Sequence, residues 1–414
     1  MEQEKVILVG VETEETWKNF GESMQELKGL TKTAKGEVCF SLVQKRPQVD
    51  RQTIIGKGKL TELKNLVESY EADLVIFNHE LTPRQSQTIA DFIAVPVIDR
   101  VQLILDIFAL RARSKEGKLQ VELAQLEYLL PRLVGQGKYL SRLGGGIGTR
   151  GPGETKLETD RRHIRNKITA IKRELKEVAA HRERTRQRRK NNRFQIGLIG
   201  YTNAGKSTIM NVLTEAKTYE QDELFATLDP LTKRWKLPEG FEVTLTDTVG
   251  FIQDLPTQLI DAFHSTLEES RDMDLLLHVV DASSPDRSQQ EQTVLDLIKD
   301  LDFDKTPILT VYNKADKIDT AHFVPTLFPN VLISAKSSRS KEELTTAVRL
   351  QLMENLEPYT VYLAQNEGKL LAQLKSETLL VHEEFLPASE NYLVKGFGLP
   401  ETAIIRRMED ELDR

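Results

Sequence analysis

The sequence has one cysteine, few aromatic residues and no long apolar run. Cys39 has no second thiol with which to form an internal disulfide, as is common in a reducing cytosol. Because a membrane-spanning helix needs about 20 consecutive apolar residues, we expect no integral membrane association. Residues 1–15 hold five glutamates and no apolar core, so they resemble neither a signal nor a transit peptide. The seven histidines show no metal-ligand spacing, so a zinc site is not predicted.

The rest of the composition is ordinary, but charge is unevenly distributed. The 414 residues are 39% hydrophobic and 29% charged, which indicates two to four folded domains. The net charge is −6, yet residues 161–193 hold fourteen Lys or Arg against three Glu, a local charge of +11 that leaves −17 elsewhere. Solvated coiled-coil helices usually mix both signs, so this basic segment favours contact with RNA or DNA phosphates. Aromatic residues are sparse there, which favours recognition of backbone or shape over base stacking.

Residues 1–113 alternate short β-rich runs with helical stretches, which predicts a small α/β domain. The expected strands are Val6–Val11, Val38–Val43, Leu74–Asn78 and Val95–Ile98, and the expected helices include Thr61–Tyr70 and Arg84–Ile93. The segment Gly56-Lys57-Gly58-Lys59 could bind a phosphate. It lacks a preceding strand and a following Ser or Thr, so we favour a turn leading into a helix.

Residues 114–193 have the pattern of a long antiparallel helical hairpin. Apolar seams with spacings of three and four are Leu119, Leu123, Leu126, Leu130 and Leu133, then Ile164, Ile168, Ile171, Leu175 and Val178. Pro131 is expected to kink the end of the first helix. The tip loop, residues 135–153, holds eight glycines together with Lys138, Arg142 and Arg150. A flexible linker is the alternative, but linkers are usually rich in serine. Glycine permits close approach and the cations favour phosphate, so the loop predicts contact with a nucleic-acid crevice.

A phosphate-binding loop follows the apolar strand Phe194–Ile199. Its residues are Gly200-Tyr201-Thr202-Asn203-Ala204-Gly205-Lys206-Ser207, and Lys206-Ser207-Thr208 opens a helix. This is the P-loop pattern in the strand-to-helix context that it requires. Backbone N–H groups and the helix N-terminus can wrap the phosphates. Lys206 can reach the β- and γ-phosphates, and the Ser207 hydroxyl can bind Mg²⁺.

Two further segments are candidates for sensing the γ-phosphate. The β-run Val243–Thr246 ends at Asp247-Thr248-Val249-Gly250, where Asp247 can hold the Mg²⁺ shell and the Gly250 N–H can contact the γ-phosphate. Between this motif and the phosphate loop lies Phe225-Ala226-Thr227-Leu228-Asp229-Pro230, in which Thr227 is the candidate switch threonine. We therefore assign Lys206, Thr227 and Gly250 as catalytic, and Ser207, Thr227 and Asp247 as the Mg²⁺ ligands.

The base is expected to be guanine. Thr310–Tyr312 leads to Asn313-Lys314-Ala315-Asp316, and the Asp316 carboxylate can accept both guanine N1–H and N2–H₂, donors that adenine lacks. Val331–Ile333 leads to Ser334-Ala335-Lys336, where a backbone N–H can meet guanine O6. The predicted nucleotide-binding set is the phosphate loop, Thr208, Phe225–Thr227, Asp247–Gly250, Asn313, Lys314, Asp316 and Ser334–Lys336.

These motifs predict a multidomain α/β protein. Residues 194–356, with helices expected over Thr257–Ser270 and Arg287–Leu301, indicate a P-loop GTPase domain with a doubly wound, mostly parallel sheet. Residues 357–414 indicate a small α+β domain of β-α-β-β order, over Tyr359–Leu363, Leu370–Leu374, Leu379–Phe385 and Tyr392–Phe397.

The phosphate motifs closely resemble those of the HflX family of translational GTPases, in the Obg-HflX superfamily. The resemblance also includes Asp99-Arg100, the segment Leu119–Leu126 and Gly148-Thr149-Arg150-Gly151-Pro152-Gly153-Glu154-Thr155-Lys156-Leu157-Glu158. It covers roughly Val6–Leu356, and the glycine loop fused to a basic helix is its most specific part. It implies binding to the large (50S) ribosomal subunit and the 70S ribosome, with the hairpin loop directed towards rRNA near the peptidyl-transferase region. It also implies separation of stalled ribosomes into subunits during stress. The candidate RNA contacts are Lys138, Arg142, Arg150, Arg161, Arg162 and Arg165.

Hydrolysis is expected to be slow without a partner. Many GTPases place Gln after the switch-II glycine to orient the attacking water, but this chain has Phe251, and Gln253 is out of register. No arginine finger can be assigned in cis. We therefore predict stimulation of hydrolysis by the ribosome. Asn203 resembles a potassium-associated asparagine of related GTPases, so K⁺ is a candidate cofactor beside Mg²⁺ and GTP or GDP.

An rRNA-binding assembly or storage factor that uses GTP for timing is the alternative that the sequence leaves open. A membrane or trafficking GTPase is disfavoured because no lipidation motif or amphipathic anchor is present. We expect a monomeric, cytoplasmic protein that would reach the membrane only through ribosomes.

Overall fold

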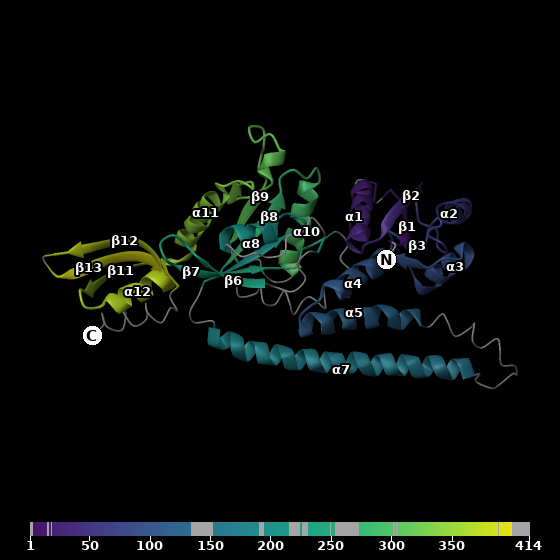
Figure 1. Ribbon diagram of the computed structural model, residues 1–414, viewed down its shortest axis with the longest axis horizontal. Coiled ribbons are helices and arrows are strands. Elements are labelled where there is room, and N and C mark those ends of the chain that lie inside the picture. Colours follow the sequence, from purple (N-terminus) through teal and green to yellow (C-terminus); the bar gives the residue numbers. More distant parts are fainter. Residues whose placement is uncertain are drawn as a thin grey trace. The chain divides into compact units, whose positions relative to one another are not determined.

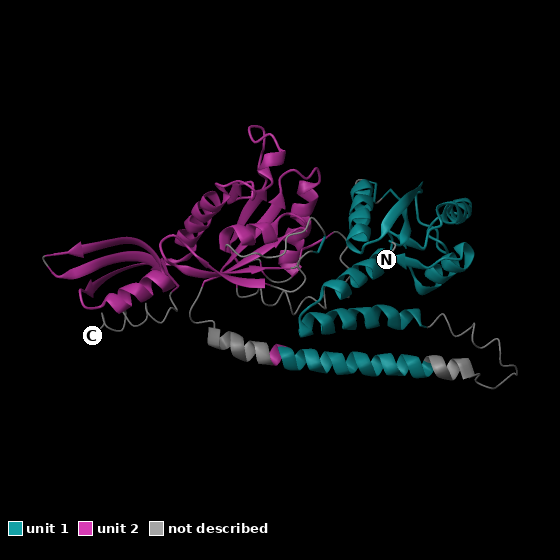
Figure 2. Cartoon of the chain, in the orientation of Figure 1, with its two compact units in different colours: residues 1–178, 222–228, 253–263 teal, residues 179–221, 229–252, 264–414 magenta. Residues whose placement is uncertain are grey.

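The computed structural model describes residues 3–14, 16–17, 19–133, 152–189, 194–214, 224–225, 231–248, 250–252, 273–300, 303, 305–387 and 389–399, with the backbone alone for 152–157 and 181–189. The chain forms two compact units (Figure 2). Unit 1 comprises Met1–Val178, Asp222–Leu228 and Gln253–Phe263, and unit 2 comprises Ala179–Gln221, Asp229–Ile252 and His264–Arg414. Each unit has its own hydrophobic core.

Unit 1 contains a four-stranded parallel sheet flanked by helices (Figure 1). Its strands, in the spatial order β2-β1-β3-β4, are β1 (Lys5–Glu12), β2 (Glu37–Lys45), β3 (Leu74–Phe77) and β4 (Val97–Asp99). Its helices are α1 (Phe20–Thr33), α2 (Lys57–Tyr70), α3 (Pro83–Ile93) and α4 (Arg100–Arg111). The apolar core of β1 is buried, as expected for a central strand covered on both faces. The predicted α/β domain is confirmed, and Gly56 directly precedes α2 as the turn interpretation requires.

Asp99, at the junction between β4 and α4, has a buried carboxylate that also binds two side chains of the first hairpin helix. Asp99 accepts the N–H groups of Gln102 and Leu81, each at 2.9 Å, and thereby caps α4. It also accepts the Tyr128 hydroxyl at 2.8 Å and the Arg132 guanidinium at 3.1 Å. The β4–α4 junction, the segment at Leu81 and α5 therefore meet at one side chain, which explains why an acidic residue stands at the end of this strand.

The hairpin consists of α5 (Lys115–Arg132) and α7 (Pro152–Arg189) (Figure 1). Ion pairs join the two helices: Lys115 with Glu174, Lys167 with Glu122 and Lys172 with Glu127. Although α7 is 38 residues long, it is strongly polar. None of the helices in the described part of the chain has the combination of length and apolar character needed to cross a membrane.

The two predicted hairpin seams are buried to different degrees. In α7, Ile171 is buried, and the other seam residues are half-buried between exposed positions. In α5, Leu123 is the one seam leucine that is buried, whereas Val121, Ala124 and Tyr128, outside the seam, are also buried, and the helix packs against α4 as well. The helix ends at Arg132, one residue after Pro131.

Unit 2 contains a six-stranded sheet of spatial order β10-β9-β8-β5-β7-β6. The strands are β5 (Gln195–Gly200), β6 (Leu231–Lys236), β7 (Glu242–Asp247), β8 (Leu275–Asp281), β9 (Ile308–Asn313) and β10 (Asn330–Leu332). The helices include α8 (Lys206–Thr214), α10 (Arg287–Asp300), α11 (Ser340–Asn355) and the 3₁₀ turn η3 (Ala315–Lys317). All neighbouring strands are parallel except β6, which runs antiparallel to β7. The doubly wound sheet is thus confirmed, and the predicted helix over 257–270 lies outside the described residues.

A three-stranded antiparallel sheet completes unit 2. It comprises β11 (Glu357–Ala364), β12 (Leu379–Leu386) and β13 (Asn391–Gly398) in the order β11-β13-β12, with α12 (Gly368–Glu377) between β11 and β12 in the chain. This is the predicted β-α-β-β order. Val361, Leu363, Leu374 and Val394 form its core. Leu379 instead belongs to the buried cluster of the six-stranded sheet, so the two sheets of unit 2 share apolar side chains.

Candidate nucleotide site

The phosphate loop joins the end of β5 to the start of α8. Gly200 and Gly205 are its two critical glycines. A Cβ on Gly200 would lie 2.2 Å from the Val279 carbonyl oxygen, and one on Gly205 would lie 2.2 Å from Nδ2 of Asn313. Gly205 also has φ +103°, which side chains disfavour. The loop therefore lies tightly against β8 and β9, and the N–H groups that begin α8 are suited to bind anions.

Lys206 is buried beneath this loop, with 6% of its surface exposed. Its ammonium donates to the carbonyl oxygens of Gly200 at 3.0 Å and Tyr201 at 2.8 Å. Burial lowers the pKa of Lys206 to about 8, and the negative charge of Asp247 acts in the opposite direction. The two carbonyl oxygens orient the Lys206 ammonium, and Asp247 offsets only part of its positive charge. The ammonium is therefore well placed to pair with phosphate.

The second phosphate motif lies against the loop. The Ser207 hydroxyl donates to Oδ2 of Asp247 at 2.7 Å, which brings together a hydroxyl and a carboxylate, the hard oxygen donors that Mg²⁺ prefers. Thr248 donates to the Leu198 carbonyl at 2.6 Å and so fixes this motif on β5. A Cβ on Gly250 would lie 3.1 Å from Nζ of Lys206, so the Gly250 backbone closely approaches the buried ammonium.

The guanine-directed residues also meet in space. Asn313 donates to the Ala204 carbonyl at 2.9 Å and accepts the Ala335 N–H at 2.9 Å, so one side chain joins the phosphate loop to the Ser334-Ala335-Lys336 loop. The Ser334 hydroxyl donates to the Asp316 carboxylate at 2.6 Å, and this bond keeps the pKa of Asp316 below its usual value. Asp316 thus stays ionised and able to accept two donors.

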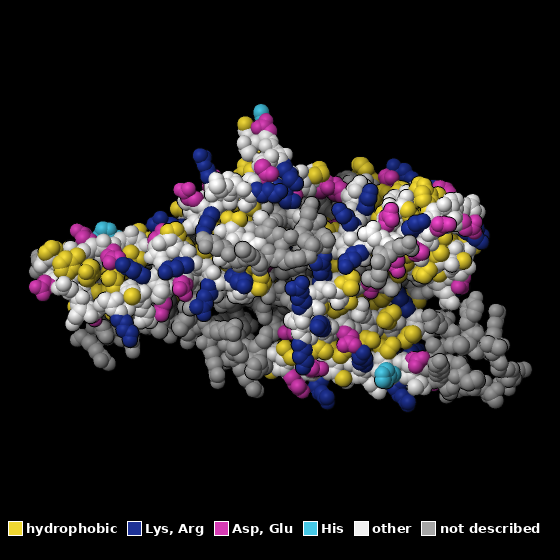
Figure 3. All heavy atoms as spheres, viewed as in Figure 1, with side chains coloured by type: hydrophobic (Ala, Val, Ile, Leu, Met, Phe, Trp, Pro, Cys, Tyr) yellow, Lys and Arg dark blue, Asp and Glu magenta, His cyan; other side chains and the backbone are white. Residues whose placement is uncertain are grey.

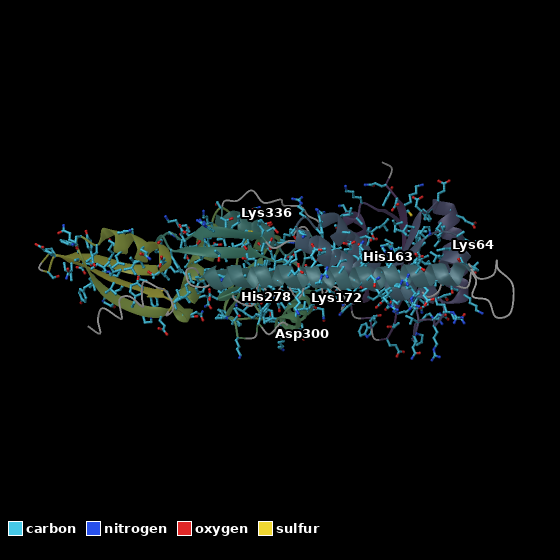
Figure 4. All side chains as sticks on the ribbon, turned by 90° about the horizontal axis from the view of Figure 1, so that it is seen from below. Lys64, His163, Lys172, His278, Asp300 and Lys336 are labelled. Carbon is cyan, nitrogen blue, oxygen red and sulfur yellow. The ribbon has the colours of Figure 1, made fainter. Side chains whose placement is uncertain are left out.

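The structure adds two residues that the sequence did not single out, Asp281 and His278, and a backbone role for Phe251. Asp281, at the end of β8, binds the Lys314 ammonium at 2.7 Å. Its position at the carboxyl end of a parallel strand was an available signal. His278, labelled in Figure 4, is buried in β8. Burial, together with the charge of Lys206, lowers its pKa to about 4. The Phe251 backbone pairs with the phosphate loop, accepting the Thr202 N–H at 2.7 Å and donating to the Gly200 carbonyl at 3.2 Å.

Several predicted site residues are placed elsewhere or lie outside the described residues. Phe225 is buried in unit 1, where its ring contacts Phe108. Arg161 is half-buried on α7, and Arg162 and Arg165 are exposed there. The predicted residues outside the described part of the chain are Lys138, Arg142, Arg150, Ala226, Thr227 and Val249.

Comparison with known proteins gives a consistent assignment for three successive parts of the chain between residues 21 and 314. Residues 21–109 match the family described as GTP-binding GTPase N-terminal, 111–189 the GTP-binding GTPase Middle Region, and 195–314 the 50S ribosome-binding GTPase. The GTPase HflX of Alkalihalophilus pseudofirmus is 51% identical over 99% of this chain and 97% of its own length. That of Escherichia coli is 42% identical over 84% and 83% respectively.

Solved structures include similar chains as well. The crystal structure of SsGBP in complex with GDP shares 26% identity, with a TM-score of 0.48, and covers 84% of this chain and 99% of that one. The near-complete sequence matches carry the assignment. This protein is a GTP hydrolase and belongs to the HflX family of GTPases.

Proposed function

We propose that this GTPase binds the large ribosomal subunit in its GTP-bound form and separates ribosomes into subunits, and that hydrolysis releases it. The observation that carries the proposal is a basic helix continuous with the chain that enters the phosphate loop, in a protein whose GTPase domain matches a 50S ribosome-binding family. The alternative, an rRNA-binding assembly or storage factor, would use the same basic helix and the same GTPase domain.

The nucleotide contacts follow from the geometry of the loop. Lys206 would pair with the β- and γ-phosphates, and the Gly250 N–H beside it would contact the γ-phosphate. Ser207 and Asp247, with Thr227, would hold Mg²⁺, which when bound neutralises charge on the phosphate oxygens. Asp316 would select guanine, because adenine would not supply the two donors that its carboxylate can accept beside the Ser334 hydroxyl. Asn203 has φ +60° in this loop and remains the candidate residue for K⁺.

Intrinsic hydrolysis is expected to be slow because the residue after Gly250 cannot orient water. The Phe251 side chain is 2% exposed, and its backbone is committed to the phosphate loop. A group that positions the attacking water must therefore come from elsewhere, and the bound ribosome is the proposed source. Added large subunits should raise the turnover of this protein.

The RNA contact is assigned to the exposed cations of α7. Arg162 and Arg165 are exposed, and Lys and Arg side chains stand out from the described part of the hairpin (Figure 3). Lys167 and Lys172 are partly neutralised by glutamates of α5, so the charge available to RNA is smaller than the sequence count. Phosphate contacts of this kind give binding that weakens as salt rises.

Sedimentation of intact ribosomes tests the proposal. With a non-hydrolysable GTP analogue, the protein should convert 70S ribosomes to subunits and co-sediment with the large one, and with GDP it should do neither. Arg162→Glu combined with Arg165→Glu should abolish both effects. Lys28→Glu with Lys32→Glu, an equal charge change at two exposed positions of α1, should leave them intact. Association with precursor particles alone would favour the assembly factor, and no association would refute both.

A further inference from the structure

Leu224 and Phe225 belong to unit 1, although the phosphate loop before them and β6 after them in the chain belong to unit 2. The Phe225 ring is 2% exposed and packs edge-on against Phe108 of α4, with ring centroids 4.5 Å apart and an interplanar angle of 78°. Phe108 is itself fully buried. This edge-to-face geometry is favourable between aromatic rings, so the contact is a specific anchor.

The neighbouring residue adds a second contact with unit 1. Leu224 lies over Gly29 of α1, where a Cβ would be 3.1 Å from the Leu224 Cδ1 atom. A glycine inside a helix is otherwise unfavourable, so its use here makes room for Leu224. Phe225 has φ +55°, a conformation that non-glycine residues rarely adopt and that persists where the surroundings hold it.

The anchor lies two residues before the candidate switch threonine. Two residues span at most about 7 Å, so Thr227 cannot travel far while the Phe225 ring stays in place. Ordering of Thr227 by Mg²⁺ and the γ-phosphate would therefore either strain or release the Phe225 anchor. In both cases the energy of the switch is linked to α1 and α4, the two helices that hold Leu224 and Phe225.

We propose that Phe225 is a positioning residue that couples the nucleotide state to unit 1, through its seat on Phe108 and the space above Gly29. The inference rests on the proposed switch role of Thr227. Because coupling is reciprocal, any partner that unit 1 binds more tightly in the GTP state must also raise the affinity for GTP relative to GDP. The anchor therefore connects the RNA-directed hairpin to the chemistry of the phosphate loop.

Gly29→Leu tests the anchor without removing a core side chain. Leucine favours the helix, but it would occupy the place of Leu224. Gly21→Leu in the same helix is the matched control, because nothing lies within 4 Å of its Cβ position. In the absence of ribosomes, the rate of hydrogen exchange in α4 should differ between the protein bound to a GTP analogue and the protein bound to GDP. This difference is expected for the wild type and for Gly21→Leu. That difference should vanish in Gly29→Leu and in Phe225→Ala. Persistence in Gly29→Leu would overturn the inference.

Ribosomal binding provides an independent readout. The wild type and Gly21→Leu should bind large subunits about tenfold tighter with the analogue than with GDP, and Gly29→Leu about twofold or less. If the wild type shows no nucleotide preference while its exchange difference still depends on Gly29, the proposed function fails and the anchor stands. If the wild type shows the preference and Gly29→Leu keeps it, the anchor fails and the proposed function stands.

Discussion

The Asn313 side chain holds the carbonyl oxygen of Ala204 at 2.9 Å, although 109 positions separate the two residues in the chain. Its other amide atom accepts the Ala335 N–H. One buried amide thus fixes the distance between the loop that wraps phosphate and the loop that faces the base. The spacing between the phosphate-binding and base-binding parts of the site is therefore set by a side chain that need not touch the nucleotide.

Replacing Asn313 by Ala should weaken binding of GDP and GTP alike. Two hydrogen bonds would be lost and a buried N–H left without its acceptor, which costs about 1–3 kcal/mol and corresponds to roughly a fivefold to hundredfold change in dissociation constant. Titration with a fluorescent GDP analogue measures this. Asn355→Ala, which removes a bond to Gln351 within α11, should leave the affinity unchanged. Equal affinities for wild type and Asn313→Ala would contradict this role.

Nucleotide binding should take up a proton in alkaline solution because of Lys206. Its pKa of about 8 lies below the ordinary 10.5, so between these values the folded protein holds a neutral amine where the unfolded chain would be charged. Phosphate charge favours the ammonium, so binding near pH 9 should bring a proton with it, and affinity should fall as pH rises above 8. Calorimetry in buffers of different ionisation enthalpy reports the uptake. At pH 7 it should be absent, and an equal uptake at both pH values would exclude Lys206 as its source.

Unit 2 should lose stability in mild acid through His278. The folded pKa of about 4 lies below the ordinary 6.5, so protons bind the unfolded chain first as pH falls through this window. The loss should reach about 3 kcal/mol by pH 4, and none of it should remain above pH 6.5. Urea unfolding followed by fluorescence of the buried Trp235 measures it. His278→Gln should flatten this slope, whereas His382→Gln, at an exposed site, should keep it. A slope unaffected by His278→Gln would refute the assignment.

Tyr312→Phe should loosen the segment that follows the guanine motif. Thr326 donates its hydroxyl proton to buried Glu291, so the Tyr312 hydroxyl must donate to Thr326 while accepting the N–H groups of Thr326 and Leu327. Loss of this acceptor costs about 1–3 kcal/mol locally. Hydrogen exchange at 326 and 327 should accelerate. Tyr359→Phe, which removes a hydroxyl bonded to Thr378 in the C-terminal sheet, should not affect those amides.

Much of unit 2 could be predicted from sequence because its motifs encode local geometry. The glycines at 200 and 205 signal a loop that passes within van der Waals contact of neighbouring strands, and an apolar strand followed by that loop fixes the topology. The pairing of Asp281 with Lys314 was missed because it links residues that are distant in the chain. Charge alone does not reveal such a partner.

Unit 1 shows where periodicity is insufficient. α4 is apolar on nearly all sides from Val101 to Phe108, so it has no amphipathic rhythm and was not predicted. The leucine seam of α5 predicts a single face towards its hairpin partner, but the helix has a second neighbour in α4. Phe225 was grouped with the nucleotide residues by its position in the chain, whereas its surroundings depend on a core that is assembled from another part of the sequence.

The apolar residues shared by the two sheets of unit 2 have a practical consequence. Leu356 and Leu379 lie in the same buried cluster, and Phe397 and Leu399 pack against it. A protein truncated after position 356 would expose an apolar patch on its GTPase domain and would be prone to aggregate. A well-behaved isolated GTPase fragment should therefore retain the chain through position 399.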